Sequence, residues 1–384
     1  MEAQKVYGVP SFGSIFVTGV KVGALVPTFV WLQLANEELR DSYRSAPAAD
    51  SRTPPKNPPK VYRWSYRVVS FSRSRRHLSD QAHRGAGDVG QPVIHDVFEP
   101  RTGTWQYVVS DPSTLAAIII DPVLDYDRET QSISTSSAEE ILTLVGKEGY
   151  HVQRILETHA HADHLTAASY LQARLSGTQT TKPAIGIGKR IGQVQTLFGH
   201  RYGVAEHERE GVFDKLFEDD EAFSIGNIQA IAIHLPGHTP DHLGYMIGDN
   251  VFCGDSLFHV DIGTARCDFP GGSASNLYRS GRRLLSLPGH VKIWTGHDYP
   301  PDGRTDPVPW TTVQDHRAHN KHLKDGIAED EFVALRKARD ANLGEPRLLH
   351  QSLQTNIRGG QLPEPTASGH RMLRVPLKLG GLSW

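Results

Sequence analysis

Apolar runs and amphipathic segments alternate along the chain from Pro92 onward. Short apolar runs bounded by turn residues indicate buried strands, whereas apolar residues three and four apart indicate helices. By these rules, the predicted strands cover residues 105–109, 115–120, 152–156, 228–235, 243–247, 251–253 and 291–294. The predicted helices cover residues 164–175, 276–287 and most of 311–341, whereas 356–384 is predicted to be irregular.

Turn and capping residues divide these segments. Gly248-Asp249-Asn250 predicts a tight hairpin turn, and Asp111-Pro112-Ser113 predicts a turn between the first two strands. Ser136 or Ser137, followed three residues later by Glu139 or Glu140, predicts a helix that begins with a capping box. Strands in runs with helices between them suit two sheets whose outer faces are covered by helices.

The first ninety residues differ from this pattern. An apolar stretch over 12–34 is interrupted by Lys21 and Pro27. A lysine at the centre of a spanning helix costs roughly 2.5 to 3.5 kcal/mol, so no stable membrane insertion is expected. Residues 54–59 resemble a Pro-rich linker, and 63–84 has the Arg- and Ser-rich composition of a transit peptide, but far from Met1. We therefore expect a flexible extension over 1–90 and a catalytic domain over 91–384.

Charge and cysteine content restrict the function classes. A net charge of -2 gives no reason to expect nucleic acid as a partner. Two cysteines, Cys253 and Cys267, argue against a disulfide-stapled secreted protein and favour an intracellular, cytoplasmic or mitochondrial location. The sequence leaves open whether the chain forms a homodimer. The twenty histidines direct attention to metal chemistry.

Four ligand-type side chains gather in the segment Thr158-His159-Ala160-His161-Ala162-Asp163-His164, directly after a predicted strand. In extended chain, His159 and His161 can point the same way, while Asp163 and His164 follow where a helix is predicted to begin. Burying so many polar groups without a metal or other partners would be costly. The alternative, a solvated histidine-rich turn, explains this spacing less well, so we predict a metal site.

Three later residues have the same placement, each just past a predicted strand. They are His238 in Pro236-Gly237-His238, Asp255 in Gly254-Asp255, and His297 in Gly296-His297-Asp298. Each one alone is an ordinary surface or core residue. Together with the first segment they predict one centre, because strand-end loops are where α/β scaffolds place functional groups.

With these motifs in order, the sequence resembles the metallo-β-lactamase superfamily. The resemblance implies an αββα sandwich with the metal at one edge. In the two-metal pattern of that superfamily, His159, His161 and His238 would hold one metal. The second would be held by Asp163, His164 and His297, with Asp255 bridging. With an aspartate at the bridging position, the sequence resembles the glyoxalase II and persulfide dioxygenase branch. Antibiotic-hydrolysing members often have cysteine there.

The segments 263–272, 277–280, 296–300 and 356–360 most resemble the persulfide dioxygenases. That resemblance implies one Fe(II) held by His159, His238 and Asp255, with positions left open for a persulfide sulfur and O₂. The other four ligand-type residues would orient ligands and water, with Asp163 and His297 in catalytic roles. Arg266 and Tyr299 match positions that contact glutathione. The plain alternative for Arg266 is a salt bridge to Asp268 or Asp261, and Cys267 is expected to be a small buried residue.

Two other functions remain open at this stage. All seven ligand-type residues are present, so a hydrolase with two Zn(II) ions could cleave a thioester, lactone or lactam, including a xenobiotic one. A non-catalytic binding protein on the same fold is less favoured, because a degenerate member would be expected to have lost a ligand. The leading prediction is oxidation of glutathione persulfide by O₂ to sulfite and glutathione.

Overall fold

The computed structural model describes residues 90–381. The predicted extension, with its apolar stretch, Pro-rich segment and Arg- and Ser-rich segment, lies outside the described residues except for Gly90. Within 90–381, no helix is both long and apolar enough to cross a membrane.

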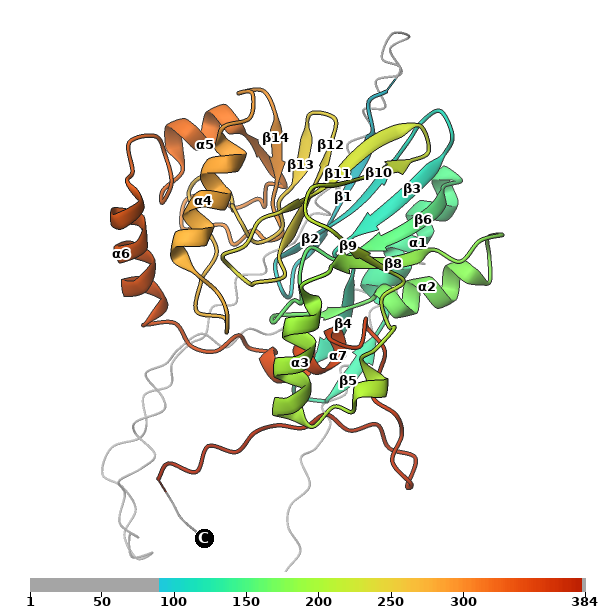
Figure 1. The fold of residues 1–384 in the computed structure, drawn as a ribbon. Helices are drawn as coiled ribbons and strands as arrows, with labels where there is room; N and C mark the ends of the chain where they lie inside the picture. The colour runs from blue at the N-terminus through green and yellow to red at the C-terminus, as the bar shows by residue number, and fades with distance from the viewer. Residues whose placement is uncertain (1–89, 382–384) are drawn as a thin grey trace, which may run out of the picture. The chain divides into compact units, whose positions relative to one another are not determined.

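One mixed sheet is built from the first half of the described chain (Figure 1). Its strand order is β1-β2-β3-β6-β8-β9. The strands are β1 (Val93–Glu99), β2 (Thr104–Ser110), β3 (Ala116–Ile120), β6 (His151–Leu156), β8 (Ala184–Gly188) and β9 (Lys215–Phe217). The predictions for β2, β3 and β6 are confirmed to within a residue at each end, because these strands are apolar runs of the expected length.

A second sheet follows, in the order β10-β11-β12-β13-β14-β15. Its strands are β10 (Glu221–Ile225), β11 (Ile228–His234), β12 (Leu243–Ile247), β13 (Asn250–Phe252), β14 (Lys292–Trp294) and β15 (Trp310–Thr312). Three short strands, β4 (Val123–Asp127), β5 (Ser132–Ser134) and β7 (Leu165–Thr166), form a small separate sheet. The four strands predicted between residues 228 and 294 are confirmed.

Side chains alternate between two apolar layers along the central strands. In β2, Tyr107 and Val109 pack between the two large sheets, while Val108 faces the outer helices. In β11, Ala232 faces the interior between the sheets and Ile233 the opposite side. The outer layers are covered by α1 (Ser136–Glu148) and α2 (Ala168–Ser176) on the first sheet and α4 (Ala274–Leu285) on the second. The expected αββα sandwich is therefore confirmed (Figure 1).

Two local predictions about helix starts are wrong. The helix expected from His164 begins at Ala168, because Leu165 and Thr166 form β7 and pair with β4. The helix expected to be capped by Ser136 or Ser137 has Thr135 at its N-cap, without a side-chain cap bond. Ser137 instead bonds to the Asp125 carboxylate through its backbone N–H and its hydroxyl.

The remaining helices are α3 (Ile191–Tyr202), α5 (Val313–His319), α6 (Glu329–Asp340) and α7 (Leu349–Asn356). Two helices in 311–341 confirm the helical prediction for that segment, apart from the short strand β15. No helix or strand is present over 357–381, which agrees with the predicted irregular end.

Strand direction determines where the ligand-bearing loops emerge. β13 and β14 are parallel, and β11 runs in the same direction because it is antiparallel to β12, which is antiparallel to β13. The loops after these three strands therefore leave the second sheet at one edge. In the first sheet, β3 and β6 are parallel and end together, so Asp121 lies beside the loop that follows β6.

A chain that begins at Gln91 should stay soluble and keep its metal. The reason is that β1 begins at Val93 and all seven ligand-type residues lie in the described unit. Thermal unfolding and metal content of this shortened chain, measured beside the full chain, check the expectation. Aggregation or loss of metal would mean that the first ninety residues support the catalytic fold.

Candidate metal centre

The ligand loop, residues 157–164, is fixed by hydrogen bonds to buried carboxylates. Asp121 accepts hydrogen bonds from the Thr158 backbone N–H at 2.7 Å and from the Thr158 hydroxyl at 2.8 Å. The Asp241 carboxylate accepts a further bond from the Ala160 N–H at 2.9 Å. These bonds satisfy backbone groups that the loop would otherwise bury without partners, and they fix its path.

Ligand atoms of His159, His238 and Asp255 form one set, all within 4.8 Å of one another. The Nδ1 of His238 lies 2.8 Å from the Arg266 carbonyl, and the Nδ1 of His159 lies 3.0 Å from the Thr158 hydroxyl. Both rings therefore leave their Nε2 atoms free for the centre, because a bond at one ring nitrogen fixes the role of the other. The His238 Nε2 lies 3.6 Å from Asp255 Oδ2.

A second set, also within 4.8 Å, contains His161, Asp163, His164 and His297. The Nε2 of His297 lies 3.1 Å from Asp163 Oδ2 and 3.5 Å from Asp255 Oδ1. The two oxygens of Asp255 thus face different sets, Oδ2 toward His238 and Oδ1 toward His297. This placement suits the bridging position that the sequence analysis expects.

His161 departs from the expected arrangement. In the two-metal pattern it would join His159 and His238, but its ligand atom groups with the second set instead. Its Nε2 lies 3.1 Å from Asp121 Oδ1 and 3.2 Å from Glu157 Oε2, and both carboxylates are buried. Only Nδ1 remains for any other partner.

Glycines before the ligands allow close backbone approach. Gly237 has φ 146°, and a Cβ there would lie 2.3 Å from the Leu277 backbone nitrogen. A Cβ at Gly296 would lie 2.6 Å from Asp255 Oδ1. Glycine is therefore required at both positions, since the Cβ of a larger residue would push a neighbouring ligand out of place.

The surroundings shift the pKa of the buried histidines of the centre in different directions. Burial lowers the pKa of His159 well below its ordinary value, and the nearby imidazoles of His161 and His242 lower it further. Burial also lowers the pKa of His164. Although burial alone would lower it, the carboxylates of Asp121 and Glu157 raise the pKa of His161 well above its ordinary value. Neutral imidazole is the form that binds metal, so His159 is ready to act as a ligand.

Several polar atoms of these sets are buried and lack a hydrogen-bond partner within residues 90–381. They are His159 Nε2, His161 Nδ1, both ring nitrogens of His164, Asp163 Oδ2 and Asp255 Oδ1. Such unpaired atoms are rare in folded proteins and signal an ion or water at the site. Imidazole nitrogens and carboxylate oxygens are the ligands that iron and zinc accept, so the donor set fits either metal.

The two predicted substrate contacts lie in different surroundings. Tyr299 is half exposed, and its ring stacks on His297 with centroids 5.6 Å apart. The Arg266 guanidinium makes a paired contact with the Asp268 carboxylate and donates to the Gly344 carbonyl at 2.9 Å. The salt bridge weighed as the plain alternative for Arg266 is thus present, and the contact from Arg266 to His238 is made by the backbone.

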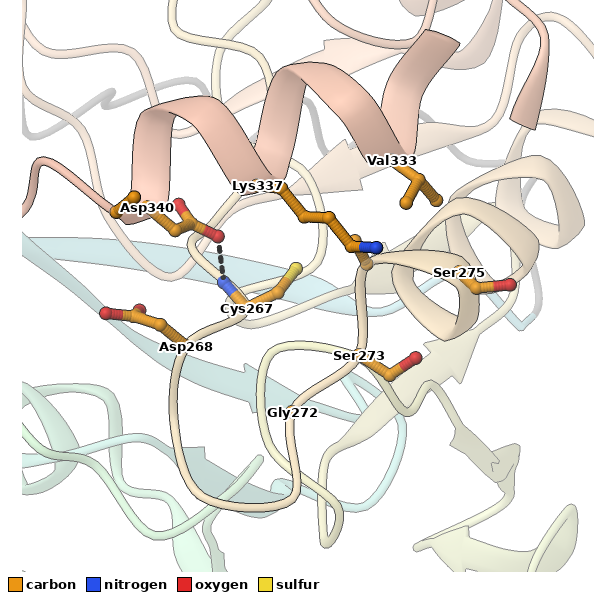
Figure 2. A pocket seen from close by; sticks show the side chains of 10 residues that line it. Cys267, Asp268, Gly272, Ser273, Ser275, Val333, Lys337 and Asp340 are labelled. Carbon is orange, nitrogen blue, oxygen red and sulfur yellow. Dashed lines mark hydrogen bonds between the residues drawn. The ribbon is translucent and has the colours of Figure 1, made fainter. Parts of the chain in front are cut away.

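A cavity of about 550 Å³ lies between α6 and the loop that carries Arg266 (Figure 2). The Cys267 N–H donates to Asp340 Oδ2 at 2.9 Å across this cavity wall. Helix α6 therefore holds Cys267 in place, and the carbonyl of the preceding residue, Arg266, bonds to His238. Cys267, expected to be buried, is only partly buried; burial raises the pKa of its thiol to about 12, which disfavours the reactive thiolate.

Sequence reasoning missed some residues of the centre. Asp121 and Glu157 were not singled out, although each directly follows an apolar strand that was predicted. His242 was also missed; its Nε2 accepts the Asp255 N–H at 2.9 Å and so orients the carboxylate between the two sets. An acidic residue directly after a predicted apolar strand would have pointed to Asp121 and Glu157, whereas no local pattern points to His242.

Comparisons with known proteins agree with this geometry. The family model of the metallo-beta-lactamase superfamily matches residues 100–297. A beta-lactamase hydrolase-like protein of Agrobacterium fabrum is 44% identical over 295 residues, which is 76% of this chain and 67% of that protein. The mitochondrial persulfide dioxygenase ETHE1 of Bos taurus is 28% identical over 76% of this chain and 96% of its own length. The crystal structure of ETHE1 from Myxococcus xanthus matches with a TM-score of 0.56 and 26% identity, covering 70% of this chain and 100% of that one.

Proposed function

We propose that this chain, which belongs to the metallo-β-lactamase superfamily, is an iron-dependent persulfide dioxygenase. Its reaction would consume O₂ and water and convert glutathione persulfide to sulfite and glutathione. The observation that carries the proposal is the separate set of His159, His238 and Asp255, two imidazoles and one carboxylate. Relatives named persulfide dioxygenase ETHE1, and a solved structure named ETHE1, support it.

Ferrous iron bound by these three side chains would offer open positions for a persulfide sulfur and for O₂. The protein's part is to orient its own ligands: the Arg266 carbonyl fixes the ring of His238, and His242 fixes the Asp255 backbone. In this function the second set orients ligands and water instead of holding a metal. The carboxylates of Asp121 and Glu157 engage the Nε2 of His161 and so fix the orientation of this ring beside the centre.

Substrate recognition is proposed to involve Arg266 and Tyr299. A guanidinium binds a carboxylate through paired hydrogen bonds, and glutathione carries two carboxylates. Arg266 would have to share its guanidinium with Asp268, or exchange Asp268 for the substrate, since the paired contact is occupied by that residue. Tyr299, half exposed over the His297 ring, can donate a hydrogen bond beside the centre.

A hydrolase with two zinc ions is the second candidate function. The four ligand-type side chains of the second set and the two-sided placement of Asp255 favour it. A relative with 44% identity carries a hydrolase-like name. In that function both sets would bind metal, and a thioester, lactone or lactam carbonyl would be attacked by a metal-activated water.

Oxygen uptake separates the two functions. Protein loaded with ferrous iron without oxygen should bind about one iron per chain and consume O₂ when given glutathione persulfide. His238→Ala and Asp255→Ala should abolish both metal retention and uptake. His164→Ala should keep its iron and lose roughly 10- to 100-fold in rate, because it would orient ligands without binding iron.

The same preparations should be tested on a panel of thioesters, lactones and lactams after loading with zinc. No O₂ uptake by the iron-loaded protein, with hydrolysis of any panel member by the zinc-loaded protein, would replace the dioxygenase by the hydrolase. Equal and complete loss of activity in all three ligand variants would also favour two working metals.

Arg266→Ala should lower kcat/KM for glutathione persulfide by roughly one to two orders of magnitude, since a lost charge-assisted bond costs about 1.5 to 3 kcal/mol. Iron content should not change, because the contact from residue 266 to His238 is made by the backbone carbonyl. Asp268→Asn is the matched control: it breaks the same ion pair but keeps the guanidinium, so turnover should persist. If both variants lose activity equally, Arg266 has only a structural role.

A further inference from the structure

We propose that Asn356, the last residue of α7, is a positioning residue that holds the metal-ligand loop in its binding conformation. The inference rests on the metal centre of the proposed function but not on dioxygenase chemistry, and it applies equally to iron or zinc. Asn356 lies well beyond residue 297, where the match to the family model ends.

The side-chain amide of Asn356 bonds to the ligand loop at two points and to the adjoining strand β7 at a third. Its Nδ2 donates to the carbonyls of His161 and His164, both at 2.8 Å. Its Oδ1 accepts the Thr166 backbone N–H at 2.8 Å. The side chain is buried, and the two acceptors and one donor around it fix which way the amide points. The two carbonyls lie on either side of Asp163, so Asn356 sets the bend of the chain there.

Apolar contacts also connect the ligand loop with the end of α7. Ala160 and Ala162 alternate with the histidine ligands along the loop, and both belong to an apolar cluster that contains Leu353 and Ile357. The alanines therefore belong to the same apolar cluster as the end of α7, while the imidazoles of His159 and His161 contribute to the metal sets. A shift of α7 would disturb the loop, because this helix contributes to both its apolar and its polar contacts.

The chain after Asn356 is itself firmly held. Gly360 has φ 84°, and a Cβ there would lie 3.0 Å from the Thr166 carbonyl and 3.1 Å from the Ser169 nitrogen. Arg358 is buried and forms an ion pair with Glu208 at 2.8 Å. With these contacts on its C-terminal side, Asn356 has little freedom to move away from the ligand loop.

Gln354 provides a matched control in the same helix. It is also a buried side-chain amide with three hydrogen bonds. Its Nε2 donates to the His350 and Arg374 carbonyls at 2.6 and 2.8 Å, and its Oε1 accepts the Arg374 N–H at 2.9 Å. None of these partners belongs to the ligand loop. The hydrogen bonds of Asn356 are buried, whereas those of Gln354 are only partly buried and two of them join it to the exposed Arg374, so Gln354→Ala should cost no more stability than Asn356→Ala.

The test compares Asn356→Ala with Gln354→Ala in the full chain. Both should lower the melting temperature of the chelator-stripped protein, Gln354→Ala by no more than Asn356→Ala. Only Asn356→Ala should weaken retention of metal, by roughly 10- to 100-fold, as expected when a group that orients ligands is lost. Affinities for Zn(II), and for Fe(II) without oxygen, are measured by competition with a chromophoric chelator.

If Asn356→Ala does not fold, Asn356→Asp serves instead, since it keeps the acceptor for Thr166 and loses both donated bonds. Metal affinity equal to wild type in a folded Asn356 variant, or an equal loss in Gln354→Ala, would overturn the proposal. Because affinity is measured without substrate, an absence of O₂ uptake would defeat the proposed function and leave this result standing.

Discussion

Burial of imidazoles and carboxylates at one edge of the sandwich is the constraint on which the structure around the centre depends. An unpaired polar group away from water costs free energy, so these side chains need an ion or water at the centre together with fixed hydrogen-bond partners. The fold meets this requirement from three directions. The first sheet supplies Asp121 beneath the loop, the second supplies the His238, Asp255 and His297 loops, and α7 supplies Asn356.

The two ligand sets are not equivalent, and the difference bears on the chemistry. His159 is kept neutral by burial and points a free Nε2 at the centre. His161 is held between two buried carboxylates and groups with the residues around Asp163. Unpaired buried atoms remain in both sets, so the first set alone would hold a single metal with open positions, and the two sets together would hold two metals. A second metal would require His161 to bind through Nδ1 while keeping both carboxylates.

The residue pattern predicted the strands and the ligands better than it predicted their supports. Strands such as β12 are buried apolar runs, which a local pattern identifies directly. The helix start at His164 was wrong because Leu165 and Thr166 pair with β4, a strand some forty residues earlier that the pattern did not reveal. The bonds from Asn356 to the loop and to Thr166 span 190 to 195 residues, and no local pattern contains such a contact.

The location of metal in the folded protein tests the account most directly. Crystals of the full chain, grown from protein purified without oxygen, allow anomalous difference maps above and below the iron and zinc absorption edges. The account predicts one iron peak among His159, His238 and Asp255, and none in the second set. Two zinc peaks, one in each set with Asp255 between them, would contradict it.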